Sequence, residues 1–297
     1  MNAASSLRGR LAAHTPGFVR KAVRMAEHYG RRHVEWLNIL REMQGASLRD
    51  RLVLGTSALA APITSLRRMD GFEPPLPLAD IDVMAKGVGR FSLRAGTDDI
   101  IHVLSAREPA VRRVVESCLG PGDVFVDAGA NIGFFSVLAQ KQVGPAGQVI
   151  AFEMMPETAA RLRHHFAINA LPSARVIENA LSDSDGDILV ATSSASKFGQ
   201  ASISAQFSDV AERTIRHEVR TIRLDTALAD TGEIALIKMD LEGAEYAALC
   251  GADAVLARTR AIIFENNAGD SRIPDLLRAK GFVVEHLDGS DYLARRS

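Results

Sequence analysis

The stretch D-V-F-V-D-A-G-A-N-I-G-F-F-S, residues 123–136, consists of an apolar strand, a glycine-rich turn and the start of a helix. A short, nearly continuous apolar run of this kind is typical of a parallel strand buried on both faces. Gly129 lets the chain turn tightly and a ligand approach the backbone, and Gly133 lets the helix pack closely on the strand. The stretch therefore predicts a ligand-binding turn at the carboxyl end of a parallel strand.

The same pattern continues along the chain. Further strands are expected at 148–153, 174–179, 234–240 and 261–266, with helices at 133–142, 156–169, 243–257 and 271–280 and another beginning at Glu108-Pro109. This alternation predicts an α/β fold with a doubly wound, open sheet. Two last apolar runs flank D-G-S at 288–290, which predicts an antiparallel hairpin at the end of an otherwise parallel sheet. That departure from the dinucleotide-binding layout favours a methyltransferase.

The turn after the first strand does not match a phosphate-binding loop. Residue 131 is Asn, so the G-x-G-x-x-G fingerprint is absent, as is the Gly-Lys-Ser/Thr of a P-loop. Glu153 ends the next strand, where an acidic side chain accepts hydrogen bonds from the hydroxyls of a ribose. Loop and acid together indicate a nucleoside without pyrophosphate, with Asp127 near a cationic group. S-adenosylmethionine fits this description, and a nicotinamide oxidoreductase is disfavoured.

Five motifs follow one another in the chain: D-A-G-A-N-I-G-F-F-S (127–136), F-E-M-M-P-E (152–157), E-N-A-L-S-D-S-D-G (178–186), T-I-R-L-D-T (221–226) and I-K-M-D-L-E-G-A-E (237–245). Over roughly residues 95–270, the sequence resembles the FkbM-type methyltransferases. The resemblance implies a class I, Rossmann-like fold with a mostly parallel seven-stranded sheet closed by an antiparallel hairpin. It also implies S-adenosylmethionine as cofactor and methyl transfer, usually to a hydroxyl of a sugar or polyketide-like product.

The resemblance also implies cofactor contacts, position by position. The methionine end would be lined by Asp127, Gly129, Asn131 and Gly133, the ribose held by Glu153, and the adenine flanked by Asn179, Ala180 and Leu181. The family commonly has a single residue or proline before Pro156, whereas this chain has Met154-Met155. We expect that difference to shift the turn on the ribose side.

Methyl transfer to a hydroxyl requires a group that aligns the oxygen and removes its proton. The catalytic candidates are Asp240, Glu242 and Glu265, which follow two neighbouring strands. Asp240 is expected to face the acceptor, with Glu242 or Glu265 orienting it or serving as the base. Asp240 and Glu242 would share one face if the chain is still extended there. Glu242 could instead cap the next helix, with Glu245 on that helix's surface.

Two alternatives involve other side chains. Asp240, Glu265 and Asn266 could hold a divalent ion such as Mg²⁺, which prefers oxygen ligands. The stretch T-D-D-I-I-H, residues 97–102, resembles a polar segment that approaches the cofactor in this family, although Thr97 or Asp98 could equally be a helix N-cap. The pair His164-His165 is expected on a solvated helix face. Neither cysteine, Cys118 or Cys250, is placed as a nucleophile.

The charge distribution divides the chain at a linker rich in Gly and Pro, residues 70–80. Residues 1–68 carry 12 Lys and Arg against 4 Asp and Glu, and the rest carries 23 against 32. We expect a basic, mainly helical segment at 1–79, with a stripe of Phe18, Ala22, Met25 and Tyr29, and a methyltransferase domain at 80–297. The basic segment is expected to pack on the main domain, to form a solvated face, to mediate homo-oligomerisation, or to bind nucleic acid or an anionic membrane.

Composition and motifs also limit the partners. No apolar stretch approaches the ~20 residues of a membrane span, no signal peptide is apparent, and two cysteines do not make a disulfide framework, so a cytoplasmic protein is expected. The acceptor is expected to be a small molecule, a glycan or a glycolipid, with the polar loop 192–210, including Phe198 and Phe207, beside it. An RNA methyltransferase is less favoured because the catalytic half is acidic. A non-catalytic nucleoside-binding module is the remaining alternative.

Overall fold

The computed structural model describes residues 17–64, 75–104, 106–194, 197–202 and 214–296. Within these ranges, side chains are not described at 17–29, 62–64, 192–194, 197–202 and 214–215.

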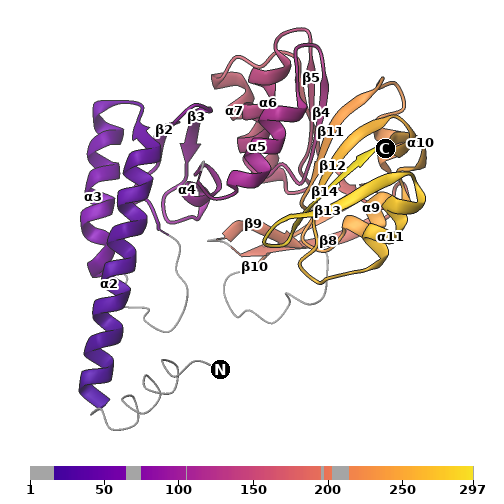
Figure 1. The fold of residues 1–297 in the computed structure, drawn as a ribbon. Coiled ribbons are helices and arrows are strands. Elements are labelled where there is room, and N and C mark those ends of the chain that lie inside the picture. Colours follow the sequence, from indigo (N-terminus) through magenta and orange to yellow (C-terminus); the bar gives the residue numbers. More distant parts are fainter. Residues whose placement is uncertain (1–16, 65–74, 105, 195–196, 203–213, 297) are drawn as a thin grey trace.

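A seven-stranded sheet forms the centre of the fold (Figure 1). Its strands are β4 (Val124–Ala128), β5 (Gln148–Phe152), β6 (Ala174–Ile177), β11 (Ile234–Met239), β12 (Thr259–Glu265), β13 (Phe282–Asp288) and β14 (Asp291–Arg296). They lie in the order β13-β14-β12-β11-β4-β5-β6. Neighbours from β12 to β6 are parallel, whereas β14 is antiparallel to both β12 and β13. The predicted α/β sheet with a closing antiparallel hairpin is confirmed.

Helices cover both faces of this sheet, as its strands require because their side chains are apolar on both sides. The first face packs against α5 (Pro109–Cys118), α6 (Phe134–Val143) and α7 (Pro156–Ile168), and the other against α8 (Leu224–Ala227), α9 (Glu245–Cys250), α10 (Asp253–Ala257) and α11 (Arg272–Ala279). Strand side chains alternate between these layers: Phe125 belongs to the first and Val126 to the second.

One expected helix, at 243–257, is two helices in the structure. α9 ends at Cys250 and α10 begins at Asp253. The carboxylate of Asp225 accepts hydrogen bonds from the backbone N–H groups of Ala254 and Val255, at 3.1 and 2.8 Å. A new helix N-terminus is therefore stabilised here by a residue from a different element.

A second sheet lies beside the first and has the order β7-β10-β8-β9. It consists of β7 (Ala180–Leu181), β8 (Ile188–Ser194), β9 (Lys197–Ser202) and β10 (Thr214–Ile222). The expected polar loop at 192–210 is thus partly wrong, because β8 and β9 pair as antiparallel strands. Residues 203–213, with Phe207, and the side chain of Phe198 lie outside the described residues.

The described N-terminal residues contain two helices, α2 (Gly17–Glu42) and α3 (Leu48–Thr64). The side chains of the expected stripe Phe18, Ala22, Met25 and Tyr29 lie outside the described residues. A three-stranded antiparallel sheet follows, in the order β1 (Met43–Gly45), β2 (Ile81–Ala85), β3 (Gly89–Leu93). This sheet combines strands from both sides of the expected boundary at 79/80, which stays a prediction.

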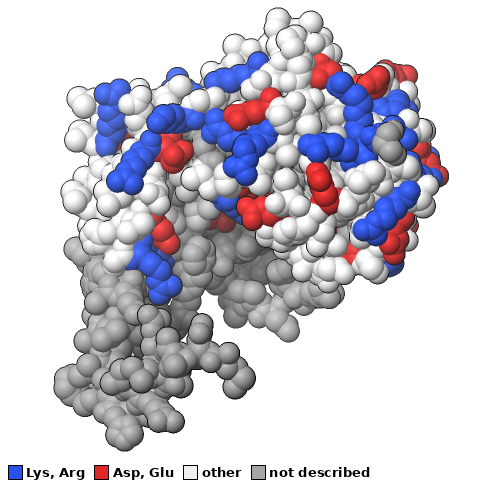
Figure 2. Space-filling model, viewed as in Figure 1, with Lys and Arg blue, Asp and Glu red and all other residues white. Residues whose placement is uncertain are grey.

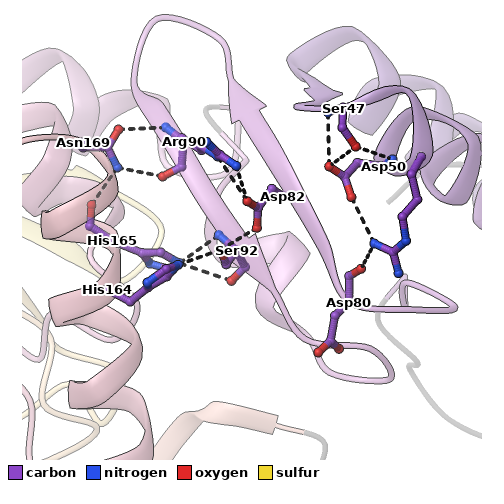
Figure 3. A network of polar contacts seen from close by, with 10 residues as sticks. Ser47, Asp50, Asp80, Asp82, Arg90, Ser92, His164, His165 and Asn169 are labelled. Carbon is purple, nitrogen blue, oxygen red and sulfur yellow. Dashed lines mark hydrogen bonds and ion pairs between the residues drawn. The ribbon is translucent and has the colours of Figure 1, made fainter.

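A polar network joins β3 to α7 (Figure 3). His165 is fully buried; its Nε2 accepts a hydrogen bond from the Ser92 N–H at 2.9 Å, and its Nδ1 lies 2.7 Å from the carbonyl oxygen of Ile132. Burial lowers the pKa of His165, so the neutral ring donates through Nδ1. Asn169 pairs with both backbone groups of Arg90, at 2.8 and 2.7 Å. The expected solvated face is therefore wrong for His165, because this side of α7 packs on the small sheet, whereas His164 is exposed.

No helix in the described part of the chain is both long enough and apolar enough to cross a membrane.

Candidate active site

A cavity opens at the carboxyl ends of β4 and β11, where neighbouring parallel strands of an open sheet bind ligands. Its floor is the turn of residues 129–135 together with Asp127, and one wall is formed by Lys238, Asp240 and Glu242. The remaining lining residues, His102, Leu104, Arg107 and Glu108, come from the segment that precedes α5. We call this the first cavity.

Two glycines of the turn adopt a backbone conformation that is unfavourable for other residues. Gly129 has φ of 83° and Gly133 has φ of 89°, the left-handed region in which a side chain is strained. A Cβ at Gly129 would collide with the carbonyl oxygen of Asp240, and one at Gly133 with the side chain of Leu162. The backbone of the turn is therefore packed against β11 and α7, as expected from the motif.

Glu153 connects the turn to the next strand. Its carboxylate is 8% exposed and accepts hydrogen bonds from the backbone N–H groups of Asn131, at 3.0 Å, and Met155, at 2.9 Å. Burial raises the pKa of Glu153 to about 7. The residue thus fixes the position of the turn and does not line the first cavity, and its expected contact with a ribose stays a prediction.

The first cavity also contains an unsatisfied hydrogen-bond acceptor. Asn131 has φ of 49°, and no donor within the described residues reaches its buried Oδ1. A buried polar atom without a partner is costly, so a ligand that donates a hydrogen bond here would be favoured. The ammonium group at the methionine end of S-adenosylmethionine is such a donor. The residues of the first cavity therefore fit the expected cofactor.

Lys238 is a site residue that sequence reasoning missed. Its ammonium is 7% exposed, lies 3.2 Å from Asp240 Oδ2 and stands 5.0 Å from the centre of the Phe135 ring. Burial would lower the pKa of Lys238, but the charges of Asp240, Glu108 and Asp127 outweigh it and raise the pKa. A lysine inside the apolar strand I-A-L-I-K-M-D was the signal in the sequence, because a charge there requires buried partners.

Asp127 is the second buried charge beneath the first cavity. It is 1% exposed, and its Oδ2 accepts a hydrogen bond from the Ser136 hydroxyl at 2.6 Å. Burial raises the pKa of this carboxyl although Lys238 opposes the shift. Asp127 and Ser136 thus connect β4 to the first turn of α6 at the base of the cavity.

A second cavity adjoins the first on the side of β12. It is lined by Arg107, Glu108, Ala110, Val111, Asp240, Glu242, Glu265, Asp288, Gly289, Ser290 and Asp291. Four of these residues, Arg107, Glu108, Asp240 and Glu242, also line the first cavity. A group bound in one cavity is therefore next to a group bound in the other, with Asp240 and Glu242 between them.

The three expected catalytic carboxyl groups meet here, and their pKa values diverge. Burial would raise the pKa of Asp240, but Lys238 and a hydrogen bond with Glu265 hold it below its ordinary value. Burial and the charge of Asp240 raise the pKa of Glu265 to about 8 and that of Glu242 to about 7. At neutral pH, Asp240 is ionised and Glu265 is protonated, donating to Asp240 and accepting from the Ser290 hydroxyl at 3.1 Å.

The local backbone differs from the sequence expectation. β11 ends at Met239, and Glu242 has φ of 52°, so the chain from Asp240 to Glu242 is not extended. Glu242 is also not the N-cap of α9, which is Ala244. Glu245, expected on the helix surface, is 5% exposed and accepts hydrogen bonds from the N–H groups of Leu241 and Gly243, at 2.7 and 3.3 Å. Those unpaired backbone donors precede the helix, which explains why Glu245 turns inward.

The other expected residues lie elsewhere. Asn179 donates through Nδ2 to the carbonyl oxygen of Arg220 at 3.1 Å, and Ala180 and Leu181 are buried in β7. These three residues line neither of the two cavities. Their expected proximity to the adenine stays a prediction.

The segment 97–102 ends at the wall of the first cavity. α4 (Asp99–His102) begins after Asp98, whose side chain makes no capping hydrogen bond, whereas the Thr97 hydroxyl accepts one from the Asp99 N–H at 3.4 Å. Asp99 instead binds Arg94 through two contacts of 2.8 and 2.6 Å. His102 Nδ1 accepts from Arg107 at 2.7 Å, which places the Arg107 guanidinium between the two cavities.

Within the described residues, no group of three or more His, Cys, Asp and Glu side chains is arranged to hold a metal ion. The Mg²⁺ alternative, with Asp240, Glu265 and Asn266 as ligands, stays a prediction.

Strand order, the glycine turn and the cavity at the carboxyl strand ends define a class I S-adenosylmethionine-dependent methyltransferase. The model of the methyltransferase FkbM domain matches residues 127–284, which is more than half of the chain. The chain belongs to this family.

The names of similar proteins point to different methyl acceptors. The chain is 28% identical over 196 residues to the 31-O-demethyl-FK506 methyltransferase FkbM of Streptomyces tacrolimicus, covering 56% of this chain and 75% of the relative. It is 26% identical over 227 residues to the hexuronic acid methyltransferase AglP of Haloferax volcanii, with 75% and 82% covered. It is 31% identical over 166 residues to the 2-O-methyltransferase NoeI of Sinorhizobium fredii, with 52% and 67% covered.

Among solved structures, the methyltransferase FkbM of Methylobacillus flagellatus superimposes with a TM-score of 0.41 at 15% identity, covering 59% of this chain and 43% of that one. The fold assignment rests on the strand order and not on this likeness.

Proposed function

We propose that this methyltransferase transfers a methyl group to a hydroxyl of a sugar, glycolipid or polyketide-like small molecule. The observation that carries the proposal is the second cavity, which presents carboxylate oxygens and the Ser290 hydroxyl beside Asp240 and Glu242. Hydroxyl groups donate hydrogen bonds to such oxygens. The names of two relatives, a 31-O-demethyl-FK506 methyltransferase and a 2-O-methyltransferase, also support an oxygen acceptor.

The cofactor and three carboxyl groups have separate roles in the methyl transfer. When bound, S-adenosylmethionine supplies an electrophilic methyl group. Asp240, kept ionised by Lys238, accepts a hydrogen bond from a second hydroxyl of the acceptor, beside the one that reacts, and so orients the attacking oxygen. Glu242, whose pKa is about 7, takes the hydroxyl proton as the oxygen–carbon bond forms. Glu265 is protonated at neutral pH, so it holds Asp240 in place and does not serve as the base.

Glu242 should therefore set the pH dependence of turnover. Because its carboxylate is the active form, kcat/KM should rise with pH and level off above an apparent pKa of about 7. Glu242→Gln should abolish this ascending limb and reduce kcat/KM by about a hundredfold or more. Glu285→Gln, at an exposed carboxylate paired with Arg295, is the matched control and should leave the profile unchanged. A limb that persists in Glu242→Gln would assign the proton to another group.

The acceptor class can be tested directly with methyl glycosides, amines and RNA as alternative acceptors and labelled S-adenosylmethionine as the methyl donor. We expect release of S-adenosylhomocysteine with a glycoside and a product whose new methyl carbon has the NMR shift of a methoxy group. Labelling of nitrogen or RNA would contradict the proposal. So would an absence of S-adenosylhomocysteine with a wide set of hydroxylated acceptors, as for a non-catalytic nucleoside-binding module.

Acidic side chains around the second cavity also support a small-molecule or glycan partner over nucleic acid, whose phosphates they would repel.

Both cysteines are free, which supports the proposed cytoplasmic location.

A further inference from the structure

The N-terminal helices present apolar side chains to solvent. Among the described residues, eleven large apolar side chains are exposed, and six of them lie between residues 34 and 59: Val34, Leu37, Leu40, Leu48, Leu52 and Leu59. Leu48, Leu52 and Leu59 are 74%, 62% and 80% exposed. Single exposed leucines are ordinary, but a concentration of this kind marks an interaction surface.

The exposed leucines of α3 form a stripe opposite its buried face. Leu48, Leu52 and Leu59 follow one another at spacings of four and seven residues, which aligns them along one side of a helix. Leu54 and Ser57 are buried on the opposite side of the same helix, against the core. We call Leu48, Leu52 and Leu59 the leucine stripe. The inner face of α3 is therefore buried against the core. Among the described residues, nothing packs on its outer face.

Basic side chains accompany this surface. In the described parts of α2 and α3, every exposed side chain that is charged at neutral pH is an arginine: Arg31, Arg41, Arg49 and Arg51. Of the acidic side chains nearby, Asp50 is buried and forms a capping box with Ser47, whereas Glu42 and Glu35 are half-buried and Glu35 pairs with the buried Arg32. Figure 2 shows blue side chains over the described part of this region, at the upper left of the molecule.

The arginines decide which partner fits. Arg49 and Arg51 lie on either side of the leucine stripe, one position from Leu48 and Leu52. If a second copy packed in parallel on this stripe, Arg49 and Arg51 would face the same arginines of the partner and repel, and the described parts of α2 and α3 have no exposed acidic residue to pair with them. An anionic membrane surface offers an apolar layer to the leucines and phosphate groups to the guanidiniums. We propose that the outer face of α2 and α3 docks the protein on an anionic lipid bilayer.

The arrangement of the molecule is compatible with this role. The two helices stand at one side of the structure, separated from the seven-stranded sheet by the small sheet β1-β2-β3 (Figure 1). That sheet is joined to α7 by the Ser92–His165 and Arg90–Asn169 hydrogen bonds. Docking through the outer face of α3 would therefore bring the catalytic domain close to the membrane surface. The proposal does not depend on the identity of the methyl acceptor.

The test is co-sedimentation of the full chain with vesicles of phosphatidylcholine, alone or mixed equally with phosphatidylglycerol. We expect binding to the anionic vesicles, weaker binding at high salt, and little binding to phosphatidylcholine alone. The triple variant Leu48→Ser, Leu52→Ser, Leu59→Ser should lower the affinity for anionic vesicles by about tenfold or more. Val283→Ser, at a 62% exposed position on β13, is the matched control and should bind like the parent.

Several results would overturn the proposal. One is no binding of the parent protein to anionic vesicles. Another is equal binding of the triple variant, which would mean that charge alone attracts the protein. A third is a dimer in sedimentation velocity that the triple variant dissociates, which would assign the stripe to a second copy. Affinity for S-adenosylhomocysteine should be the same in all variants, which shows that each is folded.

Discussion

Asp240→Asn should reduce turnover by about a hundredfold or more while the affinity for S-adenosylhomocysteine stays within about twofold of the parent value. Asparagine has the same shape but cannot be ionised, so it cannot balance the buried ammonium of Lys238 at 3.2 Å or accept a hydroxyl hydrogen bond with equal strength. S-adenosylhomocysteine is the appropriate ligand because it lacks the sulfonium charge, whose interaction with Asp240 would otherwise be lost as well. Turnover and calorimetric titration together measure the two effects separately.

The matched control for this variant is Asp253→Asn. Asp253 also pairs with a lysine, Lys280, at 2.7 Å, but its side chain is 70% exposed, so removing its charge should change neither turnover nor affinity. Unchanged turnover in Asp240→Asn would remove Asp240 from the mechanism. Loss of S-adenosylhomocysteine binding would instead make Asp240 a cofactor-binding residue, since it lines both cavities.

The sheet could be predicted from the sequence because its determinants are local. Each strand of the parallel core is a short apolar run, and each turn that follows has its own glycine or acid, as at Gly129 and Glu153. Strand order then follows from the general rules of doubly wound sheets. For the same reason, the sequence alone predicts a ligand-binding turn at residues 127–133, where the first cavity lies.

The features that sequence reasoning missed depend on partners distant in the chain. His165 is buried because β3, more than seventy residues earlier, packs on α7 and offers the Ser92 N–H. The helix at 243–257 divides because Asp225 supplies a cap to Ala254 and Val255. Neither partner can be recognised from the segment itself, although Gly251, the C-cap of α9, is a local signal for the end of a helix within 243–257. Lys238 is an intermediate case, because the charge is visible in the strand but its partner Asp240 is recognised only in the fold.

Gly129→Ala should strongly weaken cofactor binding. The residue has φ of 83°, and a Cβ there would collide with the carbonyl oxygen of Asp240, a backbone atom fixed in place because the Asp240 N–H donates to Ala128 at 2.9 Å. The turn or the start of the Asp240 loop must therefore move. We expect affinity for S-adenosylhomocysteine to fall by about a hundredfold, and the free energy of unfolding to fall by about 2–4 kcal/mol.

Gly122→Ala is a control that separates the effect of this collision from the effect of backbone strain. Gly122 has φ of 88°, close to that of Gly129, but a Cβ there meets no atom within 4 Å. The free energy of unfolding of this control should therefore fall only by the cost of an alanine in the left-handed region, about 1–2 kcal/mol. Its affinity for S-adenosylhomocysteine should not change. Calorimetric titration and urea unfolding of both variants give the comparison. Equal loss of stability and unchanged affinity in both would mean that the turn tolerates a side chain at Gly129. The close approach of the turn to β11 would then not be what shapes the first cavity.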